Sequence, residues 1–201
     1  AIYKQTVLPQ QLIIVLAETG KIIIPKNIQS RVVYSKIKNQ VHQRTIGLKF
    51  LDKKIKIILQ LDDKIILEKN SIKFLLEEWK NTDNNTAGIA LNPKNYVRPK
   101  TNFFHYLTLT NSNIDGKILP SGFANGWSEI KKNRKMDWLN GGMTSWKLKL
   151  IPQIYKRNFP ILKWSVCEDL FFSYNVSKKY KLILSSKSKA KIILKKSKIN
   201  V

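Results

Sequence analysis

Cysteine, histidine and acidic residues are all scarce in this 201-residue chain. It has one cysteine, Cys167, two histidines, and 13 Asp and Glu against 37 Lys and Arg. A single cysteine excludes a disulfide framework and favours a reducing compartment, so we expect a cytoplasmic protein. Neither His42 nor His105 has a cysteine or acidic neighbour at zinc-ligand spacing, which argues against a zinc site.

Long hydrophobic runs are also missing. No apolar stretch approaches the roughly 20 residues of a membrane-spanning helix, and the first apolar segment is too short for a signal peptide. The apolar content of 43% is nevertheless ample for a core. The length and composition therefore fit one large domain, or a domain with a small appendage, and we expect a single domain.

Arginine is rare even among the basic residues, so the net charge of +24 comes mainly from lysine. The chain has 32 Lys and 5 Arg, and Ile (26) and Asn (17) are abundant too. A/T-rich codons specify Lys, Ile and Asn, so genome composition is one explanation of the excess. Nucleic-acid recognition would favour Arg, whose planar fork binds bidentately. We expect no specific nucleic-acid partner. A basic nucleic-acid-binding protein, with Asp62, Asp63 and Glu168 as a nuclease-like metal cluster, stays an alternative.

A strongly positive surface still attracts anionic partners. Nucleotide diphosphates and acidic membrane faces are two such partners. Peripheral contact with an anionic membrane surface, at the inner face of the membrane, is therefore among the expectations. Whether the Lys-rich tail, residues 181–201, makes that contact is left open.

The first part of the chain has the pattern of an α/β protein. Residues 10–18 are predicted to form a buried strand of the parallel type, and residues 54–63 form the clearest strand in the chain. A helix follows that strand, because Ile72, Leu75, Leu76 and Trp79 share one helical face. Strand, acidic turn and helix form the repeating unit of such sheets, whose ligands gather at the carboxyl ends of strands.

The remaining segments are less regular. Residues 39–50 are predicted to form a short helix, and residues 87–135 to form strands and turns rich in Asn, Gly and Pro. The tail is predicted to contain two short strands with Lys-rich ends. We expect a nucleotide-binding part over residues 1–86 and an acceptor-binding part over residues 87–201.

Two acidic pairs are informative because acidic residues are so few. Asp62 and Asp63 end the clearest strand, and like charges side by side are costly without a cation between them. Glu168 and Asp169 open a helix, where the dipole favours carboxylates in any case. A turn for the first pair and a helix cap for the second are the structural alternatives to a chemical role.

The pair Gly141–Gly142 lies between Trp138 and Trp146. Adjacent glycines mark a place where the backbone turns with positive φ or closely approaches another group. Alone this pair is weak evidence, but "DWL" precedes it and "CED" follows about 25 residues later.

Five segments in this order, "QTVLPQQLIIV", "HQRTIGLK", "ILQLDDKIILEKNSI", "DWLNGGMTSW" and "CEDLFFSYNV", resemble the family 2 glycosyltransferases. The resemblance runs from residue 5 to about residue 190. It implies a GT-A fold, with a mostly parallel central sheet flanked by helices and a smaller mixed subregion on the acceptor side. It also implies a transferase of the kind that builds cell-surface polysaccharides, which takes a nucleotide-sugar donor and a glycan or lipid-linked acceptor.

The resemblance implies a role for each motif. Asp62 and Asp63 would hold Mg²⁺ or Mn²⁺ on the donor diphosphate, and Arg44 would contact the nucleotide. The loop with Trp138, Asn140, Gly141 and Gly142 would lie near the acceptor. Asp169 would be the catalytic base, with Glu168 beside it. These residue types suit an inverting transfer, which needs a base for the acceptor hydroxyl and positive charge on the departing diphosphate.

Two departures from the family pattern affect the donor site. Lys64 stands where the family usually has a further carboxylate, so it is expected to contact a diphosphate oxygen and to weaken metal binding. The family's first strand normally precedes the segment that begins at Gln5, so we expect a truncated sequence. Both departures leave a catalytically silent nucleotide-sugar or glycan binding module as an alternative.

Overall fold

The computed structural model describes residues 2–20, 22, 24, 26–151 and 167–193. A short 3-10 helix, η1 (Ile2–Lys4), precedes a parallel pair of strands, β1 (Gln11–Leu16) and β2 (Gln29–Tyr34). Helix α1 (Gln40–Leu48) packs against β1. Asn39 caps this helix, because its side chain accepts a hydrogen bond from the backbone N–H of His42. The helix expected over residues 39–50 is therefore present. The strand expected over residues 10–18 is present as β1 and pairs in parallel, but its residues are only partly buried.

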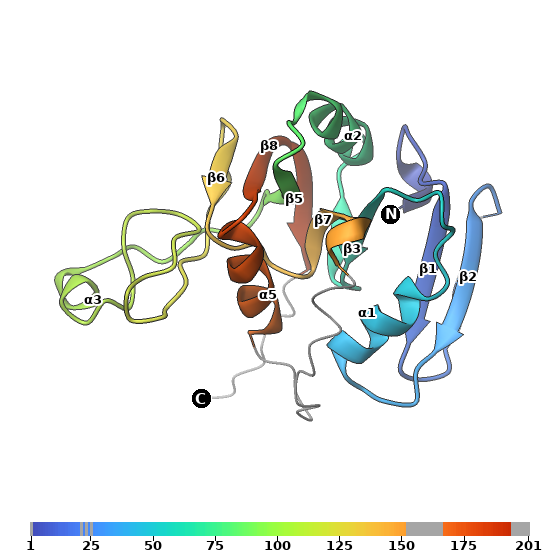
Figure 1. The fold of residues 1–201 in the computed structure, drawn as a ribbon, viewed down its shortest axis with the longest axis horizontal. Coiled ribbons are helices and arrows are strands. Elements are labelled where there is room, and N and C mark those ends of the chain that lie inside the picture. The colour runs from blue at the N-terminus through green and yellow to red at the C-terminus, as the bar shows by residue number, and fades with distance from the viewer. Residues whose placement is uncertain (1, 21, 23, 25, 152–166, 194–201) are drawn as a thin grey trace.

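A second, larger sheet forms the centre of the molecule (Figure 1). Its strand order is β3-β7-β5-β8-β4, and β6 also pairs with β8. The strands are β3 (Ile57–Leu61), β4 (Ile65–Leu67), β5 (Thr86–Pro93), β6 (Arg134–Met136), β7 (Met143–Lys147) and β8 (Lys181–Ile192). Helix α2 (Ser71–Asn81) covers one face, and α5 (Glu168–Ser177) covers the other.

The expectation of a mostly parallel sheet is wrong. In the large sheet only β5 and β8 pair in parallel, and the other pairings are antiparallel. The architecture is a mixed α/β sheet flanked by helices. The prediction failed because an apolar run indicates that a strand is buried, but it does not indicate whether the neighbouring strand runs parallel or antiparallel to it.

Strand β5 is the centre of the core, since all eight of its residues are buried. From Ile89 to Leu91 its side chains alternate between the two faces, as the pleat requires, and the register is irregular between Thr86 and Gly88. Ile89 and Leu91 pack in the cluster under α2, together with Ile72 and Leu75. Ala87 and Ala90 face the opposite cluster, which includes Trp146 of β7 and Phe172 of α5.

The helical face predicted after residue 70 is largely confirmed, although Leu76 is 40% exposed and lies outside the core. The two strands predicted in the tail are wrong. Residues 181–192 form one long strand, and residues 194–201 lie outside the described part.

The boundary expected between residues 86 and 87 does not separate two structural units. Strand β3 pairs with β7, and β4 pairs with β8, so strands from both segments share one sheet. The functional division stays a prediction.

Among the described residues β1 pairs only with β2, and β3 only with β7, so each has one unpaired edge. The first strand that the resemblance implies also stays a prediction.

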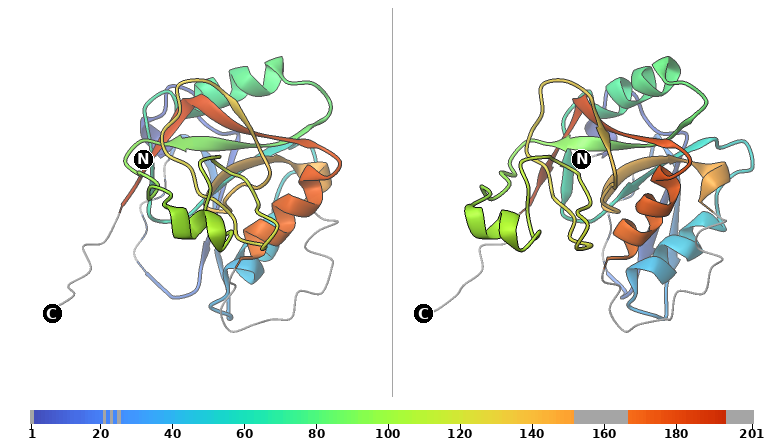
Figure 2. Two further views of the ribbon diagram at one scale, coloured as in Figure 1. Left: turned by 90° about the vertical axis from the view of Figure 1, so that its left-hand side faces the viewer. Right: turned by 60° about the vertical axis from the view of Figure 1, so that its left-hand side comes forward.

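A lobe, residues 101–128, projects from the large sheet on the side away from β1 and β2 (Figures 1 and 2). It contains the short helix α3 (Phe103–Leu107). Asn92, fully buried at the end of β5, anchors the returning chain, since its side chain donates to the carbonyl of Ile130 and accepts from the N–H of Ile130. Among the described residues, no helix has the length and apolarity needed to cross a bilayer.

Candidate functional site

The acidic turn after β3 lies against the glycine pair before β7. Because β3 and β7 are antiparallel with Leu61 opposite Met143, the residue that follows β3 meets the residue that precedes β7. The backbone N–H of Asp62 donates to the carbonyl of Gly142 at 2.9 Å. The chain then turns tightly, and the N–H of Ile65 donates to the carbonyl of Asp62 at 3.1 Å.

The two glycines are needed because side chains approach their backbone closely. A Cβ atom on Gly141 would lie 2.4 Å from Nη1 of Arg44, and one on Gly142 would lie 2.4 Å from Oδ2 of Asp62. Neither glycine is among those with positive φ. Close approach, one of the two explanations left open by the sequence, is therefore the one the structure shows.

Arg44 connects the two acidic pairs, which are far apart in sequence. Its Nη2 lies 3.3 Å from Oδ1 of Asp62, and its Nη1 lies 3.1 Å from Oε1 of Glu168. The Arg44 side chain is only 12% exposed, and that of Glu168 only 14%. One guanidinium thus bridges two carboxylates in a partly desolvated site, a task that suits its planar fork.

Gln40 also contacts Asp62, although no motif in the sequence marks it. Its side-chain amide donates to Oδ1 of Asp62 at 2.7 Å. Gln40 and Arg44 are four residues apart on α1, so they share one helical face. That spacing could have identified Gln40 from the sequence.

Glu168 opens α5 after an unusual backbone conformation at Cys167, whose φ is +62°. Burial raises the pKa of Glu168 above its usual range, and the neighbouring Asp169 carboxylate raises it further. The Arg44 guanidinium opposes this shift without cancelling it. The result is a carboxylate that holds a proton more readily than an exposed glutamate, which is a common property of general bases.

Asp169 is held by backbone groups. Its Oδ2 accepts from the N–H of Gly141 at 3.0 Å, and its Oδ1 accepts from the N–H of Leu170 at 2.8 Å. The carboxylate therefore fixes the glycine loop against the start of α5. Asp62, the second acidic pair and the glycine pair gather around Arg44. We call this group the acidic cluster: Arg44, Asp62, Gly141, Gly142, Glu168 and Asp169.

Trp138 and Asn140 lie on the chain that enters this cluster. The Trp138 indole N–H donates to the carbonyl of Asn125 at 2.9 Å, and its ring packs edge-on against Trp127 at 5.0 Å between centroids. The carbonyl of Asn140 accepts from the Thr144 hydroxyl, which closes the turn into β7. The Trp138 ring is thus fixed by the base of the lobe.

Asp63 and Lys64 are exposed in the turn between β3 and β4. Asp62 and Asp63 supply adjacent carboxylates, which suit Mg²⁺ or Mn²⁺. Within the described residues, no three His, Cys, Asp or Glu side chains gather as a metal cage would require. The residues present therefore fit an ion that also takes ligands from a substrate phosphate and water, as Mg²⁺ often does.

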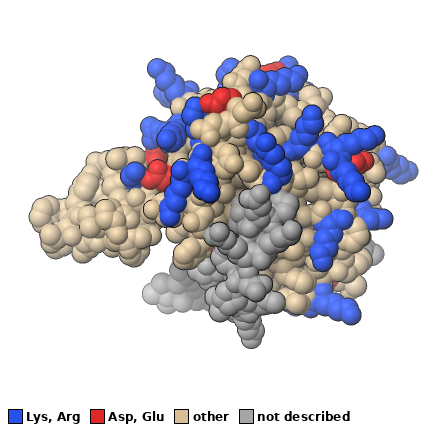
Figure 3. Space-filling view, viewed as in Figure 1, with Lys and Arg blue, Asp and Glu red and all other residues tan. Residues whose placement is uncertain are grey.

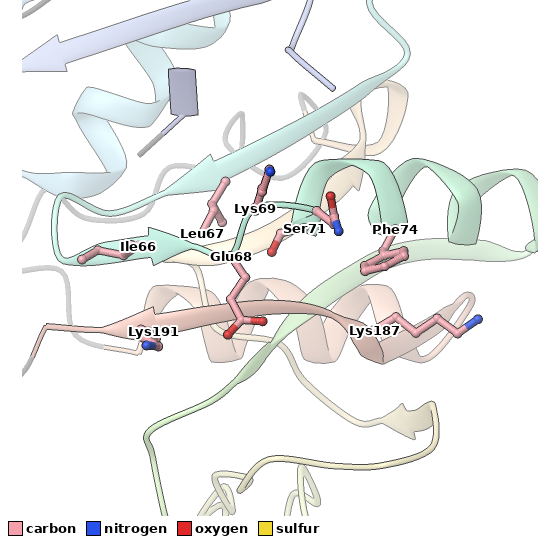
Figure 4. Close-up of a pocket in the computed structure, with 9 residues that line it drawn as sticks. Ile66, Leu67, Glu68, Lys69, Ser71, Phe74, Lys187 and Lys191 are labelled. Atoms are coloured by element: carbon pink, nitrogen blue, oxygen red, sulfur yellow. The ribbon is translucent and has the colours of Figure 1, made fainter. Parts of the chain in front are cut away.

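A cavity of about 390 Å³ lies elsewhere, between β4, the start of α2 and β8 (Figure 4). Lys69, Lys187 and Lys191 line it together with Glu68, whose carboxylate pairs with Lys94 at 2.5 Å. No residue of the acidic cluster lines this cavity. Lys187 and Lys191 lie on β8, and Lys69 precedes α2. The carboxylate that lines the cavity, Glu68, is already paired with Lys94, so we do not place the chemistry there.

Comparisons with known proteins agree with a GT-A-like fold. No protein-family model matches the chain, and no curated protein matches it. Solved structures do match: A197 from STIV has a TM-score of 0.57 at 15% identity over 92% of this chain and 85% of its own. GalNAc-T7, crystallised with UDP, GalNAc and Mn²⁺, has a TM-score of 0.61 at 12% identity over 92% of this chain. The match spans only 38% of the GalNAc-T7 chain. The chain therefore has a GT-A-like fold, and membership of family 2 stays a prediction.

Proposed function

We propose that this chain is a glycosyltransferase, which moves a sugar from a nucleotide-diphosphate sugar to a hydroxyl acceptor with inversion at the anomeric carbon. The observation that carries the proposal is the acidic cluster, in which Arg44 joins Asp62 to Glu168 beside two glycines. The likeness to GalNAc-T7, which was crystallised with UDP, GalNAc and Mn²⁺, supports it at the level of the fold.

The donor end of the proposed site is the turn after β3. Asp62 and Asp63 would hold Mg²⁺ or Mn²⁺, which when bound stabilises negative charge on the departing diphosphate. Arg44 and Gln40 orient Asp62, since both donate to its Oδ1. Lys64, exposed in the same turn, would add positive charge near the diphosphate. The nucleotide contact first expected for Arg44 stays a proposal, and its observed partners are carboxylates.

The base would come from the acidic pair at the start of α5. In the reaction the acceptor oxygen bonds to the anomeric carbon, the bond from that carbon to the diphosphate oxygen breaks, and the base takes the acceptor proton. The sequence favours Asp169, but both of its oxygens accept backbone hydrogen bonds. We assign proton transfer to Glu168, whose pKa is raised by burial, and loop positioning to Asp169.

The acceptor would enter beside the loop of Trp138, Asn140 and the glycine pair. The indole N–H of Trp138 is already bonded to Asn125, so this residue would offer the acceptor its ring. Absence of Cβ atoms at Gly141 and Gly142 lets Arg44 and Asp62 lie close to the loop. The acceptor would then be held on the side of the sheet from which the lobe projects.

The test is release of nucleoside diphosphate from a panel of nucleotide sugars, with Mn²⁺ or Mg²⁺ present and with added acceptors. The wild type should turn over at least one donor, and Glu168→Gln should lower kcat by about 10²–10⁴-fold while nucleotide binding survives. A loss confined to Asp169→Asn would move the base to that residue. Binding of nucleoside diphosphates without any turnover would identify the silent binding module instead.

A further inference from the structure

The lobe differs from the rest of the molecule in its charge. Between Thr101 and Ile114, and again between Ile118 and Ser128, the sequence has no Asp, Glu, Lys or Arg, although the whole chain has a net charge of +24. Figure 3 shows the consequence, since the projecting lobe lacks the basic side chains that are scattered over the body.

The two charged residues inside the lobe are paired near its base. Asp115 accepts a hydrogen bond from Arg134 at 2.7 Å and lies 3.5 Å from Arg98. Lys117 pairs with Asp137 at 3.0 Å. Neither charge is therefore available to give the outer part of the lobe a polar surface.

Large apolar side chains cover that outer part instead. Phe103 is 74% exposed, Phe104 70% and Leu107 68%, all on α3. Further exposed apolar residues of the lobe are Tyr106, Leu109, Ile114 and Phe123. Scattered surface hydrophobics need no explanation, but a group this concentrated on one projection marks an interaction surface.

The lobe is held in shape by its own hydrogen bonds, so this exposure is a fixed feature. Asn102 caps α3 in a reciprocal arrangement with His105. The Asn125 side chain donates to the hydroxyl of Ser112 at 2.6 Å and to the carbonyl of Ile114 at 2.8 Å. The Ser121 hydroxyl bonds to the carbonyl of Leu109, which ties the two halves of the lobe together.

Basic residues flank the lobe in the sequence, just before it begins and shortly after it ends. Lys100 precedes it, and Lys131, Lys132 and Lys135 follow it, all of them exposed. We call these four the basic collar. An apolar tip with basic residues behind it complements an anionic bilayer, because the tip enters the headgroup boundary while the lysines meet acidic headgroups. Two copies of this chain would instead bring like-charged collars together, which is unfavourable.

We propose that the lobe is a membrane-docking element, which inserts the apolar side chains of α3 into the interface of an anionic bilayer. Trp138 connects the lobe to the acidic cluster, since its indole bonds to Asn125 and its chain leads into the glycine pair. Docking would thus hold that cluster at the membrane surface. Membrane docking is a role separate from the proposed sugar transfer. Vesicle binding can be measured without any turnover, so a protein that fails to bind vesicles could still be a transferase, and an inactive protein could still dock.

The test measures partitioning onto vesicles of phosphatidylcholine alone or mixed with phosphatidylglycerol. The wild type should bind the mixed vesicles, and the triple variant Phe103→Ser, Phe104→Ser, Leu107→Ser should bind at least about tenfold more weakly. Removing collar lysines as Lys131→Gln and Lys132→Gln should weaken binding about fivefold for each charge. The matched control is Tyr3→Ser with Tyr34→Ser, which truncates exposed aromatics outside the lobe and should leave binding unchanged.

Three results would overturn the proposal. They are failure of the wild type to bind mixed vesicles, equal binding by the triple variant, and self-association of the wild type through the lobe in place of vesicle binding. If the triple variant unfolds, Phe104→Trp replaces it, because this change keeps an aromatic ring at the tip. Its fluorescence should be quenched by brominated lipid beyond the quenching of wild type, and no added quenching would also overturn the proposal.

Discussion

A Cβ atom placed on Gly142 would lie 2.4 Å from Oδ2 and 2.7 Å from Cγ of Asp62. Asp62 is short, and its backbone N–H is bonded to the carbonyl of Gly142, so it cannot swing aside at little cost. The acidic turn and the glycine loop therefore fit each other only while residue 142 lacks a side chain.

The first prediction concerns this contact. Gly142→Ala should destabilise the fold by about 1–3 kcal/mol, because overpacking displaces the Asp62 carboxylate. It should also weaken nucleoside diphosphate binding by about tenfold, a consequence of the proposed donor role. Urea unfolding and calorimetric titration measure the two effects. The control is Gly20→Ala, where no atom lies within 4 Å of the added Cβ and stability should change by no more than about 0.5 kcal/mol.

The second prediction concerns the bridge made by Arg44. Arg44→Met should lower the free energy of unfolding by about 1–3 kcal/mol, because it leaves Asp62 and Glu168 without their shared donor. Arg44→Lys should recover only part of the loss, since an ammonium group cannot reproduce the forked contact with two carboxylates. Chemical denaturation of the three proteins measures this order, and full recovery by lysine would contradict the bridging role.

The third prediction follows from the raised pKa of Glu168. Ionising this side chain costs more in the folded chain than in the unfolded one, so wild-type stability falls as pH rises from the ordinary glutamate range through the raised pKa. Glu168→Gln removes that loss. The variant should therefore gain stability relative to wild type between pH 4 and pH 7, even as transfer activity is lost.

Urea unfolding at the two pH values checks this trend. The control is Glu77→Gln on α2, at a side chain that is 49% exposed. Its effect on stability should be within about 0.5 kcal/mol at both pH values. A Glu168→Gln variant that loses stability relative to wild type as the pH rises would mean that attraction to Arg44 outweighs burial.

The fourth prediction concerns the proposed cation at Asp62 and Asp63. EDTA should weaken nucleoside diphosphate binding at least about tenfold, and Mn²⁺ should restore it, because the ion would share ligands between protein and phosphate. Asp63→Asn should have a similar effect without disturbing the fold, since Asp63 is exposed. If EDTA has no effect and Lys64→Ala abolishes binding, the lysine supplies the charge and the cation assignment is wrong.

Local structure was the most predictable part of this molecule. The apolar spacing of Ile72 and Leu75 places them correctly on the buried face of α2, and the cap at Asn39 agrees with a helix start there. These features depend on neighbours within one or two turns, which the sequence displays directly. Strand direction and partners depend on distant segments, so the antiparallel pairing of β3 with β7 could not be read from either run alone.

The site was predictable as a list of residues more than as a set of contacts. The motifs led to Asp62, the glycine pair and Glu168, and the structure brings them together. The same motifs suggested a nucleotide contact for Arg44, and no pattern indicated that its guanidinium would bridge two carboxylates. The hydrogen bonds from backbone N–H groups to Asp169 could not be predicted either, because they depend on how the glycine loop packs against the start of α5. The roles of all these residues stay predictions.

Strand β8 has a consequence for how the molecule is made. It pairs with β4, β5 and β6, yet it comes after all three in the chain. A nascent polypeptide still being extended by the ribosome therefore carries three strands that lack their common partner. The central sheet can close only after residue 192 has left the exit tunnel, so until then the unpaired edges of these strands are open to incorrect pairing.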